Sequence, residues 1–590
     1  MSESIMSDKF FSSAVCSGGG RAESGNSLEG CSYFGRQEAL FMIDTYKPSQ
    51  LETYLSEDRK LSNMTALVIP RSSKDPEDTS YQVVVAGTTL KAAELAMWKI
   101  SQPGITKFSK FFEKHSGGFP IDEVRGMLGG MSECSLPLLV EAVPEGLVVE
   151  RGTPILRITA RPINGKTHGW VVPMWLEEYQ RVWYSCTTAT IVAEYRDDLY
   201  HWIKHTVPPA AQKFTHGIIA WDFGARAGSS FQSMAIGGLA VLQAGVTGSD
   251  TMAAIDLAHT FIPDYVVDAD GNRILDSETG EPEIELAAGN IRVAFEHNCM
   301  MKYGIGLENE LRVFREERAK RPTGIFACPT DTSDPIAFLN RVTQNGPERD
   351  LMIKCWQEGN KIQFTKTTLR PDSKIILKED GVFGKAGTKL SHGDSIAFQF
   401  ELIRANTADL SPELQCQMNA MGFWELPFWL GIIYGDSLTR NDVREVRDKL
   451  WSAGWSACIL FGIGGNWHQR GNERGRLDFT AKANQQTYMY EDGHTETLSV
   501  AKTLSSKVSP LGPQKVIYRD GKIIGVPVSD GHEPDIMVPI YDGSDGIPKL
   551  YNRQSLKVVR ENLEKCMGWV YNATPEPKTF AIWHAEQTKL

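Results

Sequence analysis

Three short apolar segments in the second half of the chain each end abruptly in small or polar residues. They occupy residues 324–328, 428–434 and 457–461, and are followed by Pro329-Thr330-Asp331, Gly435-Asp436-Ser437 and Gly462-Ile463-Gly464-Gly465. Apolar runs of this length, set among longer helix-like stretches, are typical of the buried strands of an α/β fold. In an α/β barrel the active site is built from the loops after the strand ends, so these three loops are the first candidates.

The N-terminal half has a different pattern. Residues 65–69 predict a buried strand, and helical spacing follows over 91–100. Residues 138–159 predict two or three strands, broken by turn-like sequences at 144–146 and 151–153. We therefore expect an antiparallel sheet here. Helices are predicted over 175–184, 191–205 and 233–244.

Composition excludes several classes of protein. The net charge of −11 argues against a general nucleic-acid or anionic-membrane binder, because such partners require a basic face. The ten cysteines form no CxxC pairs, which favours a reducing cytoplasm and no structural zinc. No apolar run approaches the roughly 20 residues that span a bilayer, and residues 1–30 lack the apolar core of a signal peptide. We expect a cytoplasmic protein.

Eight ordered motifs then carry a family resemblance that covers about residues 40–530. They are Asp44-Thr45-Tyr46-Lys47, the tract at 142–152, Asp222-Phe223-Gly224 with Arg226, Gly248-Ser249-Asp250-Thr251, Glu296-His297, Arg370-Pro371-Asp372-Ser373, Tyr434-Gly435-Asp436 and 461–465. Each is weak alone, but their order and spacing resemble nicotinamide phosphoribosyltransferase, a type II phosphoribosyltransferase related to the nicotinate enzymes.

The resemblance implies a fold and an activity. The fold is an irregular α/β barrel of the type II phosphoribosyltransferase kind, with an added antiparallel β-sheet domain formed by N- and C-terminal parts. The expected divisions are a disordered tail at 1–37, an N-terminal α+β domain at 38–169, the barrel with the active site at 170–485, and a C-terminal segment at 486–590 that returns to the sheet. The implied reaction transfers the phosphoribosyl group of phosphoribosyl pyrophosphate (PRPP) to nicotinamide.

The base site needs flat apolar partners for a pyridine ring. By the resemblance, Phe223 supplies one face and Tyr46, from the second subunit of a homodimer, supplies the other. A purely structural interpretation makes Phe223 a core residue and Tyr46 a surface one.

Asp250 is the predicted selectivity residue. Its carboxylate can accept a hydrogen bond from the amide of nicotinamide, but it repels the carboxylate of nicotinate by about 4 kcal/mol at 4 Å and an effective dielectric near 20. Ser249 or Asp250 could instead simply cap the helix predicted at 252–259. Both interpretations can hold together.

The phosphoribosyl donor needs cationic or amide groups for phosphate and carboxylates for the ribose hydroxyls. Gly464 and Gly465 allow close backbone approach to a phosphate, and the family uses Gly435 and Asp436 around the ribose phosphate. Asp372 resembles the family's ribose-binding aspartate and Arg370 its active-site arginine, although Arg-Pro-Asp-Ser also fits a plain β-turn. The cationic residues that resemble phosphate or pyrophosphate ligands are Arg71, Arg226, Arg474 and Lys482, with Arg470 and Arg476 competing for the place of Arg474.

His297 is predicted to accept a phosphoryl group from ATP, as the equivalent family residue does, with ATP hydrolysis coupled to tighter substrate binding. Glu296 and Asp331 are its predicted carboxylate partners. Without the resemblance, a lone His at this position is more often a hydrogen-bonded core residue, or one that supports a neighbouring group, than a catalyst. Mg²⁺ is expected to be held mainly by the pyrophosphate, and the sequence does not identify any protein ligands for it.

The chain also departs from the family pattern. Trp221 replaces the usual His, Ala225 an aromatic residue, Ala227 a Gly, and Lys374 a Gly. Insertions occur near 265–285 and 375–400, and within the first a hairpin turn is predicted at 268–271 in preference to a calcium loop. A nicotinate phosphoribosyltransferase, or a catalytically silent protein that binds pyridine nucleotides, are the alternatives.

Overall fold

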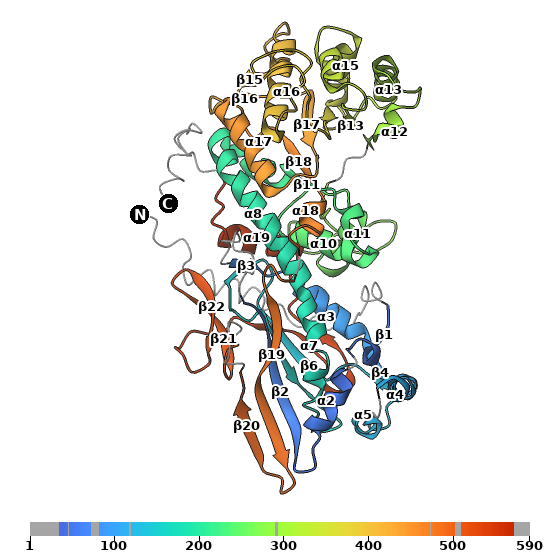
Figure 1. Ribbon diagram of the computed structural model, residues 1–590, viewed down its shortest axis with the longest axis vertical. Coiled ribbons are helices and arrows are strands. Elements are labelled where there is room, and N and C mark those ends of the chain that lie inside the picture. Colours follow the sequence, from blue (N-terminus) through green and yellow to red (C-terminus); the bar gives the residue numbers. More distant parts are fainter. Residues whose placement is uncertain are drawn as a thin grey trace. The chain divides into compact units, whose positions relative to one another are not determined.

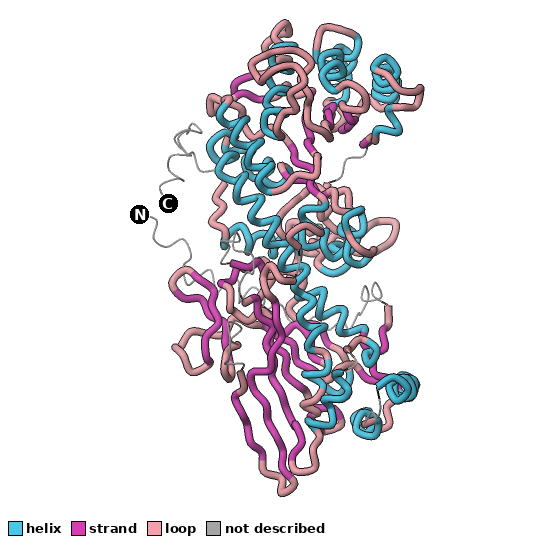
Figure 2. The backbone as a smooth tube through the Cα atoms, viewed as in Figure 1, coloured by secondary structure: helices cyan, strands magenta, loops and turns pink. Residues whose placement is uncertain are grey.

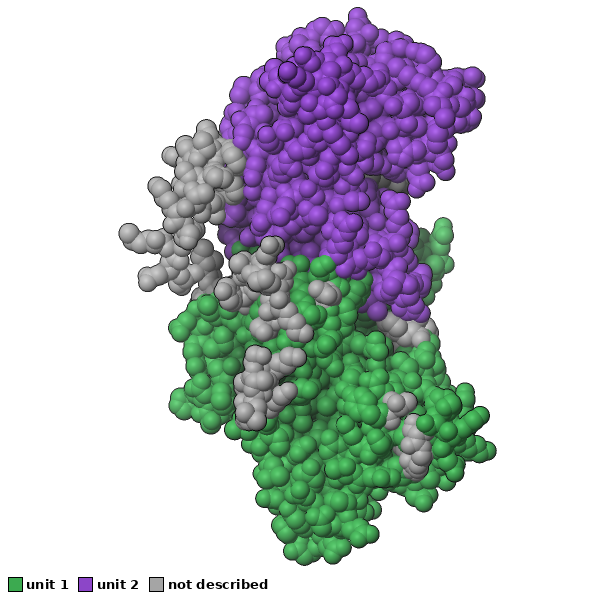
Figure 3. Space-filling model, viewed as in Figure 1, with its two compact units in different colours: residues 1–190, 256–285, 471–567 green, residues 191–255, 286–470, 568–590 purple. Residues whose placement is uncertain are grey.

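The computed structural model describes residues 35–571 apart from 45, 72–81, 117–119, 290–292, 473 and 502–508. The predicted tail at 1–37 lies almost wholly outside these residues. The chain divides into two compact units, coloured separately in Figure 3. The sheet unit comprises 1–190, 256–285 and 471–567, and the barrel unit comprises 191–255, 286–470 and 568–590.

The sheet unit is built on a seven-stranded antiparallel sheet whose strands come from both ends of the chain (Figures 1 and 2). In sheet order they are β20 (Thr495–Ser499), β19 (Phe479–Tyr490), β2 (Arg59–Pro70), β8 (Leu156–Ala160), β6 (Leu138–Ala142), β23 (Val538–Asp542) and β24 (Lys549–Leu550). The strands predicted at 65–69 and within 138–159 are therefore confirmed. The barrel was predicted to extend to residue 485, whereas β19 belongs to the sheet unit because it pairs with β2.

Helices and small sheets complete this unit. The helices are α2 (Tyr46–Tyr54), α3 (Thr88–Met97), α4 (Gln102–Ser116), α5 (Ile121–Leu128), α6 (Val171–Met174), α7 (Leu176–Tyr179) and α19 (Leu556–Cys566). The smaller sheets pair β1 (Gln37–Glu38), β4 (Trp98–Ser101) and β5 (Glu133–Cys134), then β3 (Gln82–Val84) with β7 (Val148–Glu150), β9 (Pro162–Ile163) with β10 (Lys166–Thr167), and β21 (Gln514–Arg519) with β22 (Lys522–Pro527).

One predicted helix is shorter than expected. The spacing over 91–100 predicted helix throughout, but α3 ends at Met97 and the next four residues form β4. Trp98 and Ile100 are fully buried, and β4 pairs with both β1 and β5. Strand pairing in the tertiary fold therefore overrides the local helical spacing.

The first insertion contains the predicted hairpin turn. Val267 and Arg273 pair in an antiparallel bridge, and Gly271 has a φ of 83°. The Asp268 carboxylate accepts hydrogen bonds from the backbone N–H groups of Asp270 and Asn272, both at 2.9 Å. It stabilises its own turn, as an Asx motif does.

The barrel unit contains a six-stranded parallel sheet, which confirms the predicted α/β architecture. Its order is β11 (Ala220–Asp222), β18 (Leu460–Ile463), β17 (Leu430–Tyr434), β14 (Lys366–Arg370), β13 (Ile325–Pro329) and β12 (Val293–Ala294). The apolar segments at 324–328 and 428–434 form β13 and β17, whereas β18 shares only residues 460–461 with the segment at 457–461 and continues into the glycine-rich motif. All five pairings are parallel.

Two backbone bridges extend this sheet beyond β11. Asp222 pairs with Ser249, and Gly248 pairs with Gly289, both in parallel. Residue 289 therefore lies beyond one edge of the sheet, while β12, which starts at Val293, forms the other edge. Because consecutive Cα atoms are about 3.8 Å apart, four residues bridge at most about 15 Å. The sheet must therefore curve so that its two edge strands approach each other, as they do in an α/β barrel.

Helices connect the strands of the barrel unit. They are α9 (Pro209–Ile218), α10 (Phe231–Gln243), α12 (His297–Met300), α13 (Leu307–Lys320), α14 (Pro335–Thr343), α15 (Pro347–Gly359), α16 (His392–Thr407), α17 (Arg440–Ser452) and α18 (Gly465–His468), with β15 (Gln417–Met418) and β16 (Trp424–Glu425) as a small ribbon. α8 (Trp183–Thr206) and α11 (Met252–Phe261) each run across a boundary between the units. None of the described helices combines the length and apolar character needed to cross a membrane.

Replacing Ile158 by Ala should destabilise the sheet unit. Ile158 is fully buried in β8, between β2 and β6. The lost contacts and the residual cavity should reduce the free energy of unfolding by about 2–5 kcal/mol. Urea denaturation followed by far-UV circular dichroism measures this. Met489→Ala, at an exposed position of β19, is the control, and an equal loss in both variants would contradict the expectation.

Candidate active site

The carboxylate of Asp222, at the end of β11, joins three loops of the barrel unit. Its Oδ1 accepts the backbone N–H of Gly224 at 2.8 Å and faces His468 Nε2 at 3.1 Å. Its Oδ2 accepts the hydroxyl of Ser249 at 2.9 Å. Asp222 thus fixes the loop after its own strand, the 248–251 loop and the short helix α18 together.

The Asp222–His468 pair is fully buried. Burial acts to raise the pKa of Asp222, but hydrogen bonds from His468 and Gly224 and the attraction of His468 outweigh it, so the pKa lies below its usual range. A Cβ at Gly224 would lie 1.9 Å from His468 Nε2, which explains the glycine at this position.

The ring of Phe223 packs directly against the backbone of two glycines, Gly435 and Gly462. A Cβ at Gly462 would lie 2.1 Å from Phe223 Cε2, and one at Gly435 would lie 3.6 Å from the same atom. The Phe223 backbone continues the sheet, donating to Ile463 O at 2.9 Å. The ring therefore rests on the loops after β17 and β18, and it is only partly buried. One face of a flat ligand could stack there.

Asp250 lies on the neighbouring loop. Its backbone N–H donates to Asp222 O at 3.0 Å, and its side chain is exposed. The indole Nε1 of Trp221 donates to Asp250 Oδ1 at 3.1 Å. Ser249 Oγ accepts the Thr251 N–H at 3.0 Å, a bond within the turn that precedes α11 at Met252.

The loops after β13 and β14 bring two carboxylates and an arginine together. Asp331 Oδ2 accepts the backbone N–H of Asp372 at 3.2 Å and the hydroxyl of Ser373 at 2.5 Å. Arg370 Nε donates to Asp372 Oδ2 at 3.1 Å. Burial raises the pKa of Asp372, and the nearby Asp331 adds to this, while Arg370 and His297 oppose it.

His297 begins α12 and faces this cluster. Its Nε2 lies 3.7 Å from Asp372 Oδ2 and 4.0 Å from Asp331 Oδ1, and its Nδ1 lies 3.1 Å from the hydroxyl of Thr332. The ring is 40% exposed, so a ligand could reach it. Glu296, the other predicted partner, is exposed and makes no cap hydrogen bond. The second carboxylate beside His297 is that of Asp372.

The loop that carries Gly435 and Asp436 is held in one conformation. Ser437 has a φ of 49°, a left-handed value that is uncommon for a residue other than glycine. The side chain of Asn466, on α18, donates to Ser437 O at 2.9 Å and to Leu438 O at 2.7 Å. The glycine-rich loop with Gly464 and Gly465 is thereby tied to the loop after β17. A Cβ at Gly435 would also lie 3.5 Å from Asp372 Oδ1, which links these loops to the Arg370–Asp372 pair.

The remaining predicted residues lie elsewhere. Arg226 is exposed in a 3-10 turn (Ala225–Ala227) after Phe223. The other four belong to the sheet unit: Tyr46, Arg71, Arg474 and Lys482.

Tyr46, Arg71 and Arg474 each form a hydrogen bond or an ion pair within that unit. Tyr46 is 46% exposed, and its hydroxyl donates to Glu177 Oε1 at 2.7 Å. Arg71 pairs with Asp478 at 3.1 Å, and Arg474 donates to Phe479 O at 3.1 Å. Lys482 is an exposed residue of β19.

Sequence reasoning gave no role to four residues of this arrangement: Asp222, His468, Thr332 and Asn466. Asp222 could have been found, because it is a carboxylate that directly follows a buried strand. His468 and Asn466 follow the glycine-rich loop, but their sequence carries no signal of what they contact.

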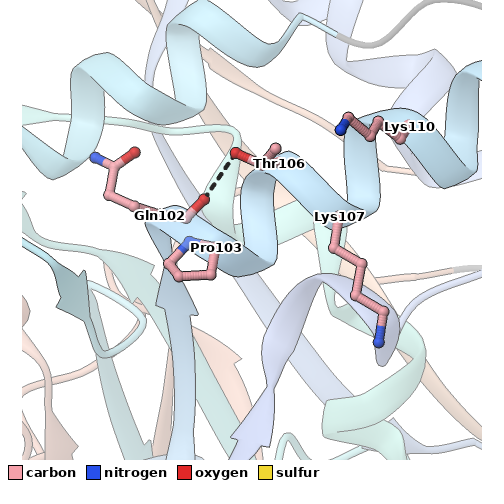
Figure 4. A pocket seen from close by; sticks show the side chains of 5 residues that line it. All are labelled: Gln102, Pro103, Thr106, Lys107 and Lys110. Atoms are coloured by element: carbon pink, nitrogen blue, oxygen red, sulfur yellow. Dashed lines mark hydrogen bonds between the residues drawn. The ribbon is translucent and has the colours of Figure 1, made fainter.

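Among the described residues no group of three His, Cys, Asp or Glu side chains is arranged to hold a metal ion. A surface hollow of about 610 Å³ lies along α4 in the sheet unit. Figure 4 shows its lining, Gln102, Pro103, Thr106, Lys107 and Lys110. None of these is a predicted site residue.

Comparisons with known proteins confirm the resemblance seen in the sequence. The chain is 26% identical over 340 residues to nicotinamide phosphoribosyltransferase of Acinetobacter baylyi, covering 56% of this chain and 57% of the relative. It is 25% identical over 346 residues to the protein of the same name from Xanthomonas campestris, covering 57% and 59%. The match thus spans little more than half the length of these curated relatives. No family model matches the chain.

Two solved structures were also compared. Nicotinate-nucleotide pyrophosphorylase from Pyrococcus furiosus has a TM-score of 0.47 at 14% identity, over 93% of this chain and 99% of that one. Human nicotinic acid phosphoribosyltransferase has a TM-score of 0.47 at 12% identity, over 91% and 95%.

Asp222→Asn should destabilise the barrel unit in a pH-dependent way. The variant replaces a buried carboxylate by a neutral amide, and hydrogen bonds to a charged group contribute roughly 1.5–3 kcal/mol each. Because the folded pKa of Asp222 lies below the unfolded value of about 3.9, its stabilisation is present above that pH and is lost as the pH falls through the folded pKa.

The difference in unfolding free energy between the unmutated protein and the variant should therefore shrink below about pH 4. Denaturation series at several pH values measure it. Glu358→Gln, at an exposed carboxylate of α15, is the control. A difference that stays constant with pH would contradict the ionised role of Asp222.

Proposed function

We propose that this protein transfers the phosphoribosyl group of PRPP to nicotinamide, giving nicotinamide mononucleotide and pyrophosphate in NAD salvage. One observation carries the proposal: the Phe223 ring rests on glycines of two strand-end loops, with Asp250 on the loop beside β11 and Asp372 beside Gly435. An aromatic ring and two carboxylates thus lie in neighbouring loops of the parallel sheet, where they would serve as base platform, amide acceptor and ribose ligand. The names of the two curated relatives support the same reaction.

The base binds by stacking and by charge. Nicotinamide would lie on Phe223, where aromatic contact contributes roughly 0.5–1.5 kcal/mol beyond burial. The Asp250 carboxylate would accept a hydrogen bond from the amide N–H of nicotinamide. Nicotinate presents a carboxylate instead, which Asp250 repels. Tyr46 of a second subunit would cover the other face of the ring in a homodimer with shared active sites.

The reaction requires one bond to form and one to break. The pyridine nitrogen attacks C1′ of PRPP with its lone pair as the bond from C1′ to pyrophosphate breaks, and the pair of electrons leaves with pyrophosphate. The nitrogen carries no proton, so no general base is needed. Catalysis then consists of positioning and of stabilising the leaving group.

The residues beside the platform have separate roles. Asp372 would bind the ribose hydroxyls, with its carboxylate oriented by Arg370. Gly435, Asp436, Gly464 and Gly465 would bind the ribose phosphate, while Arg226, Arg71, Arg474 and Lys482 would bind phosphate or pyrophosphate. Mg²⁺ bound to the pyrophosphate of PRPP would neutralise its charge, and the carboxylate oxygens of Asp331 and Asp372 are of the kind this cation prefers.

ATP would be a coupled co-substrate that phosphorylates His297. Two observations support this role. The His297 ring is 40% exposed, and the carboxylates of Asp331 and Asp372 beside it would stabilise a positively charged imidazole. The phosphoryl group moves from the γ position of ATP to a ring nitrogen, ADP leaves, and water later hydrolyses the phosphohistidine.

The activity is tested by incubating the protein with PRPP, Mg²⁺ and either base, with and without ATP, and measuring the mononucleotide formed. We expect a preference for nicotinamide that Asp250→Ala reduces by a factor on the order of 10²–10³, because about 4 kcal/mol of repulsion against nicotinate is removed. Preference of the unmutated protein for nicotinate would instead favour a nicotinate phosphoribosyltransferase. No product under any condition would favour a silent nucleotide-binding protein.

His297→Gln should abolish the stimulation by ATP while basal transfer continues. The variant keeps a polar side chain but lacks the nucleophilic ring nitrogen. Acid-labile ³²P from γ-labelled ATP should be retained by the unmutated protein and lost in the variant. His494→Gln, at an exposed histidine of the sheet unit, is the control. ATP stimulation that survives in His297→Gln would disprove the role.

A further inference from the structure

The Trp221 side chain occupies a defined place beside the predicted selectivity residue. It is 6% exposed at the middle of β11, two residues before Phe223. Its indole lies against Gly248, where a Cβ would come within 2.2 Å of Trp221 Cε3. From this position Nε1 donates to Asp250 Oδ1 at 3.1 Å. A buried, rigid ring thus holds an exposed carboxylate.

We propose that Trp221 is a positioning residue that sets the preference for nicotinamide over nicotinate by orienting the carboxylate of Asp250 toward the base site. The inference rests on the proposed function, because it concerns how the same site chooses its base. Trp221 itself is not expected to touch the reacting atoms.

The chemistry of the two groups supports this role. An indole nitrogen can only donate a hydrogen bond, so the oxygen that faces it must be an acceptor. An ionised carboxylate offers about four acceptor positions, so the bond to Trp221 leaves capacity for an amide N–H. Hydrogen bonds to charged groups are stronger than neutral ones. A bond of this kind favours one orientation of the exposed Asp250 side chain.

Packing and backbone hydrogen bonds fix both partners of the Trp221–Asp250 bond. Asp250 is fixed through its backbone to β11, and Trp221 is a residue of that strand. Gly248 supplies the space for the indole, and its backbone is not left-handed. Alanine at 248 would therefore displace the ring without straining the backbone. This gives two independent ways to remove the same bond.

A matched control exists in the same unit. Trp455 is fully buried, and its Nε1 donates to the carboxylate of Glu401 at 3.0 Å. Trp455→Phe removes an indole–carboxylate hydrogen bond of the same kind at residues not predicted to bind substrate. A general loss of stability would affect this variant and Trp221→Phe alike.

The experiment measures the binding of nicotinamide and of nicotinate by calorimetry to the full-length protein, together with kcat and KM. Trp221→Phe and Gly248→Ala should each weaken nicotinamide binding on the order of tenfold. KM for nicotinamide should rise while kcat changes little, and nicotinate binding should not weaken. Trp455→Phe should leave the ratio of the two affinities unchanged.

The possible failures are distinguishable. Unchanged affinity ratios in both Trp221→Phe and Gly248→Ala overturn the inference, as does an equal change in Trp455→Phe. If the unmutated protein binds nicotinamide but makes no mononucleotide, the proposed reaction fails and the affinity ratios still test Trp221. If it binds neither base, both proposals fail. Gly248→Ala keeps the test decisive if Trp221→Phe does not fold.

Discussion

The buried carboxylate of Asp222 is the interaction on which the candidate site depends. Three donors converge on its two oxygens, namely the backbone N–H of Gly224, the hydroxyl of Ser249 and the ring of His468, and they come from separate loops. A buried charge is stable only when it is paired and hydrogen-bonded. Because the loops satisfy Asp222 together, none can shift without leaving a buried charge incompletely bonded. The site is therefore preorganised by one side chain that is itself inaccessible to a ligand.

Glycines allow the rings around the site to pack directly against the backbone. At 224, 248 and 462 a Cβ would overlap His468, Trp221 and Phe223 respectively. Because each glycine lacks a side chain, a ring occupies that space and contacts the backbone directly. Interiors packed at this density transmit small displacements instead of absorbing them. The geometry that Phe223 and Asp250 present is thus set by atoms that a ligand never meets.

Much of this arrangement could be predicted from the sequence, and the rest could not for physical reasons. The apolar segments before Asp331 and Gly435 form β13 and β17, because burial of short apolar runs is a local signal, and the segment before Gly462 overlaps the start of β18. The motif residues supplied candidates, and His297, Asp331 and Asp372 do lie together. The Trp221–Asp250 and Asp222–His468 pairs depend on which loops meet in three dimensions, which no spacing along the chain records. The end of α3 at Met97 was likewise decided by strand pairing.

The pairing of β2 with β19 has a consequence for how the protein is made. Pro70 lies opposite Phe479, so β2, the third strand of the sheet, meets this partner only after residues 71–478 have been synthesised. At roughly 5–20 residues per second, that interval is on the order of tens of seconds. During it, one edge of β2 presents unpaired N–H and C=O groups beside apolar side chains, a surface that invites other chains to pair. The nascent chain should thus require shielding in the cell, and its yield should respond to chaperone supply and to translation speed.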